Sequence, residues 1–214
     1  MDFHKIDIGD WNRAAVYRHY MVENPCTYSM CVNIDISRIL PLAKARDLKL
    51  FPVCLYGLSC IVNHHSEFRM GYDEQGDLGY YNVSNPSYTV FHEETETFTN
   101  LWTEYNLNFK DFYQSYLDDI NFYGDKHIWQ AKPVSSDNIF YVSCIPWTSF
   151  TGFHLDLKKG YDNFSPVFTI GKYFEENGKI LLPVAIQVHH AVCDGFHVAR
   201  FINELQEWCD SFVL

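Results

Sequence analysis

The pair His189-His190 is the part of the sequence best suited to chemistry, because Asp194-Gly195 follows it closely. Residues 180–188 are nearly all apolar and predict a buried strand, while the residues after Gly195 predict a helix. A strand end that leads into a glycine turn presents side chains to a cleft. Imidazole titrates near neutral pH, so one of these histidines can act as a general base toward a hydroxyl group.

A second pair, His64-His65, shows that adjacency alone is a weak signal. It follows a predicted helix and has no Asp-Gly turn after it, so we expect a surface or structural role, as for the isolated histidines. An alternative interpretation of the first pair is a zinc hydrolase with the ligands His189, His190, Asp194 and His197. Their spacing is not H-E-x-x-H, and we expect no metal.

Apolar periodicity predicts an α+β fold with strands in the middle and helices around them. Alternation predicts strands over 27–36 and 139–145, and turn residues predict hairpins at Gln75-Gly76 and Asn177-Gly178. The second hairpin joins strand 167–174 to strand 180–188. Helical spacing predicts helices over 51–62, 109–122 and 198–209. No linker or repeat divides the chain, so we expect residues 1–214 to form one domain.

Composition excludes several classes of partner. A formal net charge of −11 without a basic stripe argues against binding to nucleic acid or to anionic membranes. No apolar stretch is long enough to cross a membrane, and no leader is visible. The seven scattered cysteines form no CxxC pair, which is typical of reduced thiols in the cytoplasm. We therefore expect a soluble cytoplasmic protein.

The run His190-Ala191-Val192-Cys193-Asp194-Gly195-Phe196-His197 resembles the signature of the trimeric (type A) chloramphenicol acetyltransferases. The shorter H-x-x-x-D-G pattern also occurs in dihydrolipoamide acyltransferases and in condensation domains of peptide synthetases. Three further stretches resemble the same family in the same order: Trp11-Asn12-Arg13, Thr89 to Phe98, and Ser143 to Trp147. The resemblance covers essentially the whole chain.

This resemblance implies the CoA-dependent acyltransferase fold, a two-layer α/β sandwich with a mixed β-sheet and flanking helices. It also implies a homotrimer with active sites between subunits. The implied activity is transfer of an acetyl group from acetyl-CoA to the primary (3-)hydroxyl of chloramphenicol, which inactivates the antibiotic without an acyl-enzyme. Acetyl-CoA is then a co-substrate, and no permanently bound cofactor is expected. The alternatives are another CoA-dependent O-acyltransferase or a non-catalytic drug-binding protein on this scaffold.

The resemblance also implies roles for individual residues. His190 matches the general base, Ser143 matches the donor to the oxyanion, and Asp194 pairs with Arg13 in a structural salt bridge. No role is implied for His189. The expected substrate pocket is mostly apolar and consists of Tyr20, Cys26, Tyr28, Phe98, Leu155, Leu157, Val167 and Thr169.

The expected contacts to coenzyme A are scattered cations and aromatic residues, because the sequence has no glycine-rich phosphate loop. They are Lys49, Lys172, Tyr173 and Trp147. Where the family often has a tyrosine after the first lysine, this chain has Phe51. Residues 124–136 match the family poorly and leave that wall of the pocket unassigned.

Overall fold

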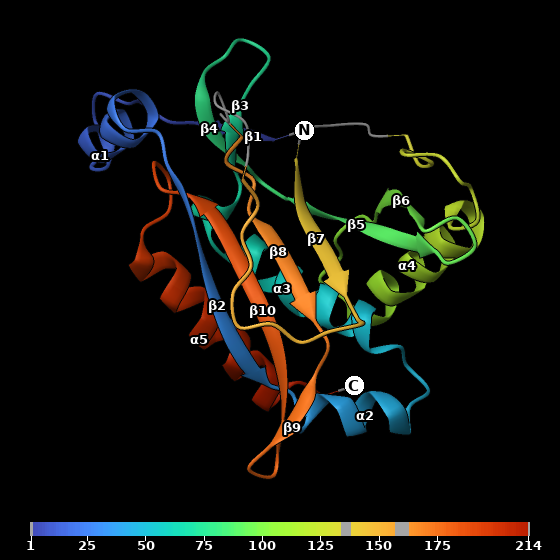
Figure 1. Ribbon diagram of the computed structural model, residues 1–214. Helices are drawn as coiled ribbons and strands as arrows, with labels where there is room; N and C mark the ends of the chain where they lie inside the picture. The colour runs from blue at the N-terminus through green and yellow to red at the C-terminus, as the bar shows by residue number, and fades with distance from the viewer. Residues whose placement is uncertain (1, 134–137, 157–162, 214) are drawn as a thin grey trace.

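The computed structural model describes residues 2–133, 138–156 and 163–213, and its main feature is a seven-stranded mixed sheet (Figure 1). The strand order is β2 (Thr27–Asp35), β10 (Lys179–His189), β8 (Val167–Gly171), β7 (Ile139–Ile145), β5 (Asn85–His92) and β6 (Thr97–Trp102). β9 (Phe174–Glu176) extends the sheet beside β10. β7 is parallel to both β5 and β8, and the other neighbours are antiparallel. The predicted α+β class with a mixed sheet is confirmed.

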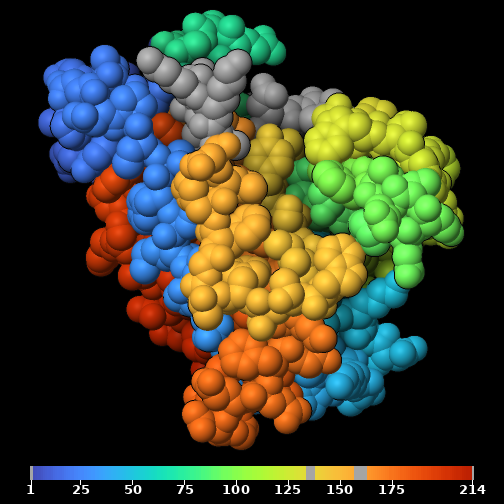
Figure 2. Space-filling model, in the orientation of Figure 1, coloured from blue at the N-terminus to red at the C-terminus, as the bar shows by residue number. Residues whose placement is uncertain are grey.

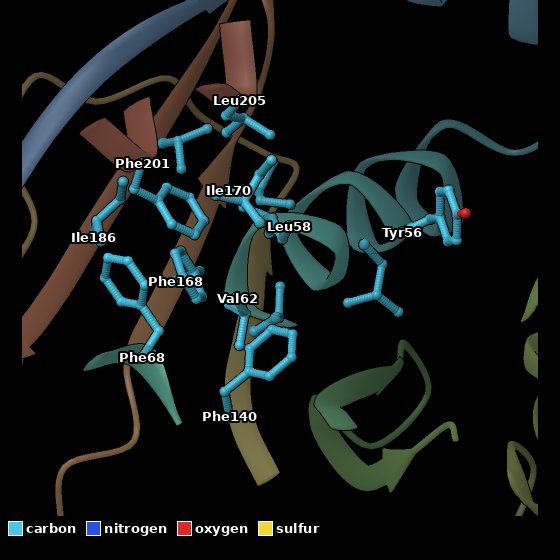
Figure 3. Packing of buried hydrophobic residues seen from close by; sticks show 14 of the residues in the cluster. Tyr56, Leu58, Val62, Phe68, Phe140, Phe168, Ile170, Ile186, Phe201 and Leu205 are labelled. Carbon is cyan, nitrogen blue, oxygen red and sulfur yellow. The ribbon is translucent and has the colours of Figure 1, made fainter. Parts of the chain in front are cut away.

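Three longer helices cover one face of this sheet: α3 (Leu50–His64), α4 (Phe109–Tyr123) and α5 (Gly195–Ser211). α3 and α5 lie behind the sheet in Figure 1 and pack against each other. The core fills the space between the two layers, where Leu58, Phe168 and Phe201 are almost fully buried (Figure 3). Burying one such side chain contributes about 1.5–3 kcal/mol. None of the helices in the described ranges is long and apolar enough to cross a membrane.

The smaller elements lie at the two ends of the main sheet (Figure 1). A three-stranded antiparallel sheet has the order β1 (Phe3–Lys5), β4 (Leu78–Tyr81) and β3 (Met70–Tyr72). The predicted hairpin at Gln75-Gly76 is the β3–β4 pair of this sheet. The remaining short helices are α1 (Ala14–Arg18), a π-helical turn (His19–Glu23), α2 (Ile39–Ala45) and a 3₁₀ turn (Ser66–Phe68). β1, β3, β4 and α1 are at one end of the main sheet, and α2 is at the other, near β9 (Figure 1).

The opposite face of the main sheet carries a chain segment instead of helices. Residues 146–156 cross in front of the strands, and Figure 2 shows them as the amber surface over the centre of that face. Side chains alternate along β10, so Ile186 points to the helices and Gln187 to this front face. The Gln187 amide forms two hydrogen bonds with the backbone of Leu155, at 2.9 and 3.0 Å. These bonds fix the segment to the sheet.

The predicted strand over 167–174 is wrong in one respect, because it consists of two strands. β8 ends at Gly171, and Lys172 turns away to donate its backbone N–H to Thr148 O at 2.9 Å. The Asn177-Gly178 turn therefore joins β9 to β10, with both residues at positive φ, 51° and 76°. Gly195 begins α5, as expected of a glycine turn that leads into the last helix.

Candidate active site

His190 lies in the turn directly after β10, and two tyrosines fix its ring. Its backbone N–H donates to Cys26 O at 3.0 Å, which ties the turn to the start of β2. Tyr20 stacks on the imidazole with 3.9 Å between ring centroids and 7° between planes. Tyr28 meets the same ring obliquely, at 5.1 Å and 61°. The ring is thus held from two sides by residues that the sequence assigned to the substrate pocket.

Arg13 holds the turn that carries His190. Its guanidinium forms a bidentate pair with the Asp194 carboxylate, with 2.6 Å between Nη2 and Oδ1 and a second bond from Nη1 to Oδ2. Arg13 also donates to His190 O at 3.0 Å and to Ala191 O at 2.9 Å. These hydrogen bonds from Arg13 lower the pKa of Asp194 below its usual value. One arginine therefore ties the N-terminal region to the turn that carries His190.

The two ring nitrogens of His190 have different surroundings. Nδ1 is buried and lies 3.4 Å from Asp194 Oδ1, yet it forms no hydrogen bond with any residue in the described ranges. Asp194 therefore approaches this ring, although its carboxylate is paired with Arg13. The side chain as a whole is 27% exposed, so Nε2 is the nitrogen on the open side.

The neighbouring histidines have structural partners. His189 is buried and its Nδ1 accepts a hydrogen bond from Ala191 N at 3.1 Å. His197 Nδ1 accepts from Asp194 N at 2.9 Å and caps α5, and burial lowers its pKa. The zinc set considered from the sequence does not converge. Among the described residues, the one group with metal-ligand spacing is His64, His65 and Glu204.

A second group of predicted residues lies on the front face of the sheet, away from His190. Ser143 pairs with Thr169, which in turn pairs with Ala185 of β10. Val167 pairs with Gln187, the residue that holds Leu155 over this face. Sequence reasoning missed Gln187, although a single amide inside the apolar run 180–188 was a usable signal.

Ser143 and His190 are far apart within one chain. His190 is five residues beyond Ala185, the residue in register with Ser143 through Thr169. From strand geometry the separation is roughly 17 Å along the strands and roughly 10 Å across them. A base and an oxyanion donor must both lie within a few ångströms of one reacting carbonyl. The two groups cannot serve the same reaction inside one chain.

The remaining predicted pocket residues lie in different places. Phe98 on β6 is 48% exposed and packs edge-on against Trp129 at 5.5 Å. Leu155 is 39% exposed on the front-face segment. Leu157 lies outside the described residues. Phe98 and Leu155 are thus both open to solvent in the single chain.

The four residues expected to contact coenzyme A lie around one end of the sheet. Lys172 and Tyr173 line a cavity of about 360 Å³, whose other walls include Phe51, Cys144 and Pro146. Lys49 precedes α3, whose first residue, Leu50, also lines the cavity, and Trp147 follows Pro146. The cavity is mostly apolar, with exposed lysines beside it. Such a site suits a long, largely apolar arm with anionic groups at its outer end.

The fold is shared with solved acyltransferases. A chloramphenicol acetyltransferase structure matches with a TM-score of 0.85 at 22% identity, covering 97% of this chain and 100% of that chain. The cubic core of a pyruvate dehydrogenase multienzyme complex matches with a TM-score of 0.67 at 15% identity, covering 92% of this chain and 86% of that one. The fold is therefore that of the acyltransferase core domains.

Sequence comparison narrows this class to one family. The family model for chloramphenicol acetyltransferase matches residues 1–206. A chloramphenicol acetyltransferase of Clostridium perfringens is 53% identical over 211 residues, which cover 99% of this chain and 100% of the relative. This chain belongs to the chloramphenicol acetyltransferase family, and it is an enzyme of the acyltransferase class. The resemblance found in the sequence is confirmed.

Proposed function

We propose that this enzyme transfers the acetyl group of acetyl-CoA to the primary (3-)hydroxyl of chloramphenicol and so inactivates the antibiotic. Relatives at about half identity over nearly the full chain carry the name chloramphenicol acetyltransferase. The His190 turn retains the parts that this reaction requires, namely an imidazole with one open nitrogen and a rigid frame around it. A drug-binding protein without activity would have no need of that frame.

His190 Nε2 is the base in this proposal. Nδ1 is buried beside the Asp194 carboxylate, so it is the nitrogen that keeps its proton, and Nε2 keeps its lone pair. Nε2 takes the proton of the drug hydroxyl while the hydroxyl oxygen attacks the thioester carbonyl of acetyl-CoA. The proton then passes to the departing CoA thiolate, and no acyl-enzyme forms. Asp194 and Arg13 hold the turn and take no part in proton transfer.

Ser143 is the donor to the oxyanion, and it comes from a neighbouring copy of the chain. The single observation that carries this assignment is the separation of Ser143 from His190 within one chain. In a homotrimer each His190 turn can face the front sheet surface of the next subunit. Ser143 Oγ then donates to the negatively charged oxygen of the tetrahedral intermediate, with Thr169 beside it on the same face.

Substrate binding follows the same division between subunits. Tyr20, Cys26 and Tyr28 surround His190 on one side of the drug pocket, and Leu155, Val167 and Phe98 form the other. An apolar pocket with few polar groups suits an aromatic, dichlorinated amide. Acetyl-CoA enters from the end where Lys172 and Tyr173 line the 360 Å³ cavity, with Lys49 and Trp147 near its mouth.

The location proposed is the cytoplasm. All seven cysteines are free thiols, as in a reducing compartment. Acetyl-CoA is a cytoplasmic metabolite, so the co-substrate is present there.

The test of this function is release of CoA thiol from acetyl-CoA with and without chloramphenicol. The wild-type enzyme should release thiol only when the drug is present, and His190→Ala should be slower by about 10²–10⁴-fold. Florfenicol, in which fluorine replaces the target hydroxyl, is the control and should give no release. Equal turnover by wild type and His190→Ala would contradict the proposal.

A further inference from the structure

The pair His64-His65, at the C-terminal end of α3, faces Glu204 of α5. His65 Nε2 donates a hydrogen bond to Glu204 Oε2 at 2.6 Å, and His64 Nδ1 lies 3.9 Å from the same oxygen. One ligand-type atom from each of the three residues lies within 4.8 Å of the other two. We propose that these three side chains bind a divalent transition-metal ion, with zinc as the best match. The sequence had suggested only a structural role for this pair.

The donor set determines the class of metal. Two imidazole nitrogens and one carboxylate oxygen form the His₂Glu set that binds zinc and leaves a fourth position for water. Imidazole also suits copper and nickel, whereas calcium and magnesium prefer oxygen ligands alone. We therefore expect the site to bind a transition-metal ion such as zinc and not an alkaline-earth ion.

The geometry needs only small movements to accept zinc. Bonds of about 2.1 Å in a tetrahedral site place ligand atoms about 3.4 Å apart. The observed separations of 2.6 and 3.9 Å lie on either side of this value. His65 and Glu204 are partly buried, at 13% and 26% exposed, while His64 is 73% exposed and its ring stacks on that of His65 at 4.7 Å between centroids. The metal takes the place of the proton on His65 Nε2, and that proton moves to Nδ1 of the same ring, which remains a neutral imidazole ligand.

No arginine of α5 neutralises the Glu204 carboxylate, so this carboxylate can bind a cation. The nearest arginine on its own helix, Arg200, pairs with Glu67 and so has its own partner. α3 and α5 pack against each other at this place, so a metal bound by both would link them. The ligands therefore come from the last residue of α3, from the residue that follows it, and from α5.

Two other places in the chain resemble one part of this site each, and they provide matched controls. His92 and His127 stack with 4.0 Å between ring centroids. Within the described ranges, no carboxylate lies close enough to this imidazole pair to form a metal-binding group with it. His19 Nδ1 hydrogen-bonds to Glu23 Oε2 at 2.7 Å, a histidine–glutamate pair without the second imidazole. We expect tight metal binding only at the site that combines two imidazoles with a carboxylate.

The experiment is a calorimetric titration of EDTA-treated, dialysed protein with zinc chloride at pH 7.5. Wild type, His127→Ala and Glu23→Gln should each bind one tight zinc ion per chain. His64→Ala and Glu204→Gln should bind at least about tenfold more weakly. Zinc should raise the melting temperature of the wild type but not that of His64→Ala. His64 is highly exposed, so its removal leaves the fold intact.

Either of two results would overturn the proposal: no tight zinc binding by the wild type, or unchanged binding by both His64→Ala and Glu204→Gln. A cobalt titration guards against binding by the free thiols, because a strong near-ultraviolet thiolate band would assign the ion to cysteines instead. The proposal does not depend on acetyl transfer. His64→Ala should keep full activity toward chloramphenicol, so failure of one proposal leaves the other untouched.

Discussion

The Tyr28 hydroxyl is buried, belongs to a ring that packs against His190, and has no hydrogen-bond partner in the described part of the chain. Burial also raises its pKa, so it stays protonated and remains a donor. An unsatisfied buried hydroxyl costs about 1–3 kcal/mol. A polar group kept at such a cost beside the active site is best explained by a hydrogen bond to the bound substrate.

Tyr28→Phe should therefore make the fold more stable by about 1 kcal/mol while raising the KM for chloramphenicol and changing kcat little. Urea unfolding and steady-state kinetics measure the two effects. Tyr88→Phe is the control, because the Tyr88 hydroxyl is bonded to Thr103 at 2.8 Å and its loss should only destabilise. If Tyr28→Phe is less stable than the wild type and its KM is unchanged, the Tyr28 hydroxyl has a hydrogen-bond partner within the protein and does not bind the drug.

The Arg13–Asp194 pair makes the stability of the enzyme depend on pH at the acid end. Asp194 has a lowered pKa in the folded state, so its contribution is present above the unfolded pKa of about 3.9 and is lost as pH falls through the folded value. Asp194→Asn should cost about 2 kcal/mol at pH 7, less than a fully buried pair, because the Asp194 side chain is 37% exposed.

Urea unfolding of wild type and Asp194→Asn at pH 7 and at pH 3 measures this effect. The gap between the two proteins should be smaller at pH 3, which lies below the unfolded pKa of about 3.9, because the unfolded wild-type carboxyl takes up a proton there. A gap of the same size at both values would mean that the carboxylate charge is not what stabilises the turn.

At the scale of single residues, the sequence predicted which side chains have chemical roles better than it predicted which residues they contact. His190 followed from its place at a strand end before Asp194-Gly195, a local pattern. The pairing of Asp194 with Arg13 joins residues 181 positions apart, and it came from the family resemblance alone. Gln187 was missed because its two bonds to Leu155 are also long-range contacts.

At the scale of elements, the strongly periodic segments were predictable within about two residues. β2, β7, α3 and α4 have regular apolar spacing over one buried face, and the Asn177-Gly178 turn has the positive φ that glycine and asparagine tolerate. β5 was not predicted from periodicity, because its first residues, Asn85 to Tyr88, are buried without a clear alternation. The break between β8 and β9 was missed because it depends on the contact of Lys172 with Thr148.

The two hydrogen bonds between Gln187 and Leu155 hold the front-face segment, residues 146–156, which forms one wall of the proposed drug pocket. Gln187→Ala leaves the Leu155 N–H and C=O without these partners and should raise the KM for chloramphenicol several-fold. The KM for acetyl-CoA should change little, because the cavity beside Lys172 lies at another part of the sheet. Separate titrations of the two substrates measure the difference. An equal rise in both KM values would point to general loosening of the fold instead.

At the scale of the whole molecule, a single chain holds two incomplete half-sites. In the proposed mechanism the His190 turn supplies the base within its aromatic frame, and the front face, roughly 17 Å away along the strands, supplies Ser143. Several large apolar side chains are exposed in the single chain, including Phe98, Trp129 and Trp147. Burying such side chains is a main source of free energy for subunit association. Both features favour the homotrimer with shared sites.

The central claim is that His190 and Ser143 act together across a subunit boundary, and subunit mixing tests it most directly. Ser143→Ala should lower kcat by about 10²–10³-fold, and His190→Ala should be similarly impaired. When the two inactive proteins are unfolded together, mixed in equal amounts and refolded, random trimers should place both intact groups in about a quarter of the sites. The prediction is recovery of about a quarter of wild-type activity. If the mixture contains mixed trimers and yet stays as inactive as its components, the two residues do not share a site between subunits.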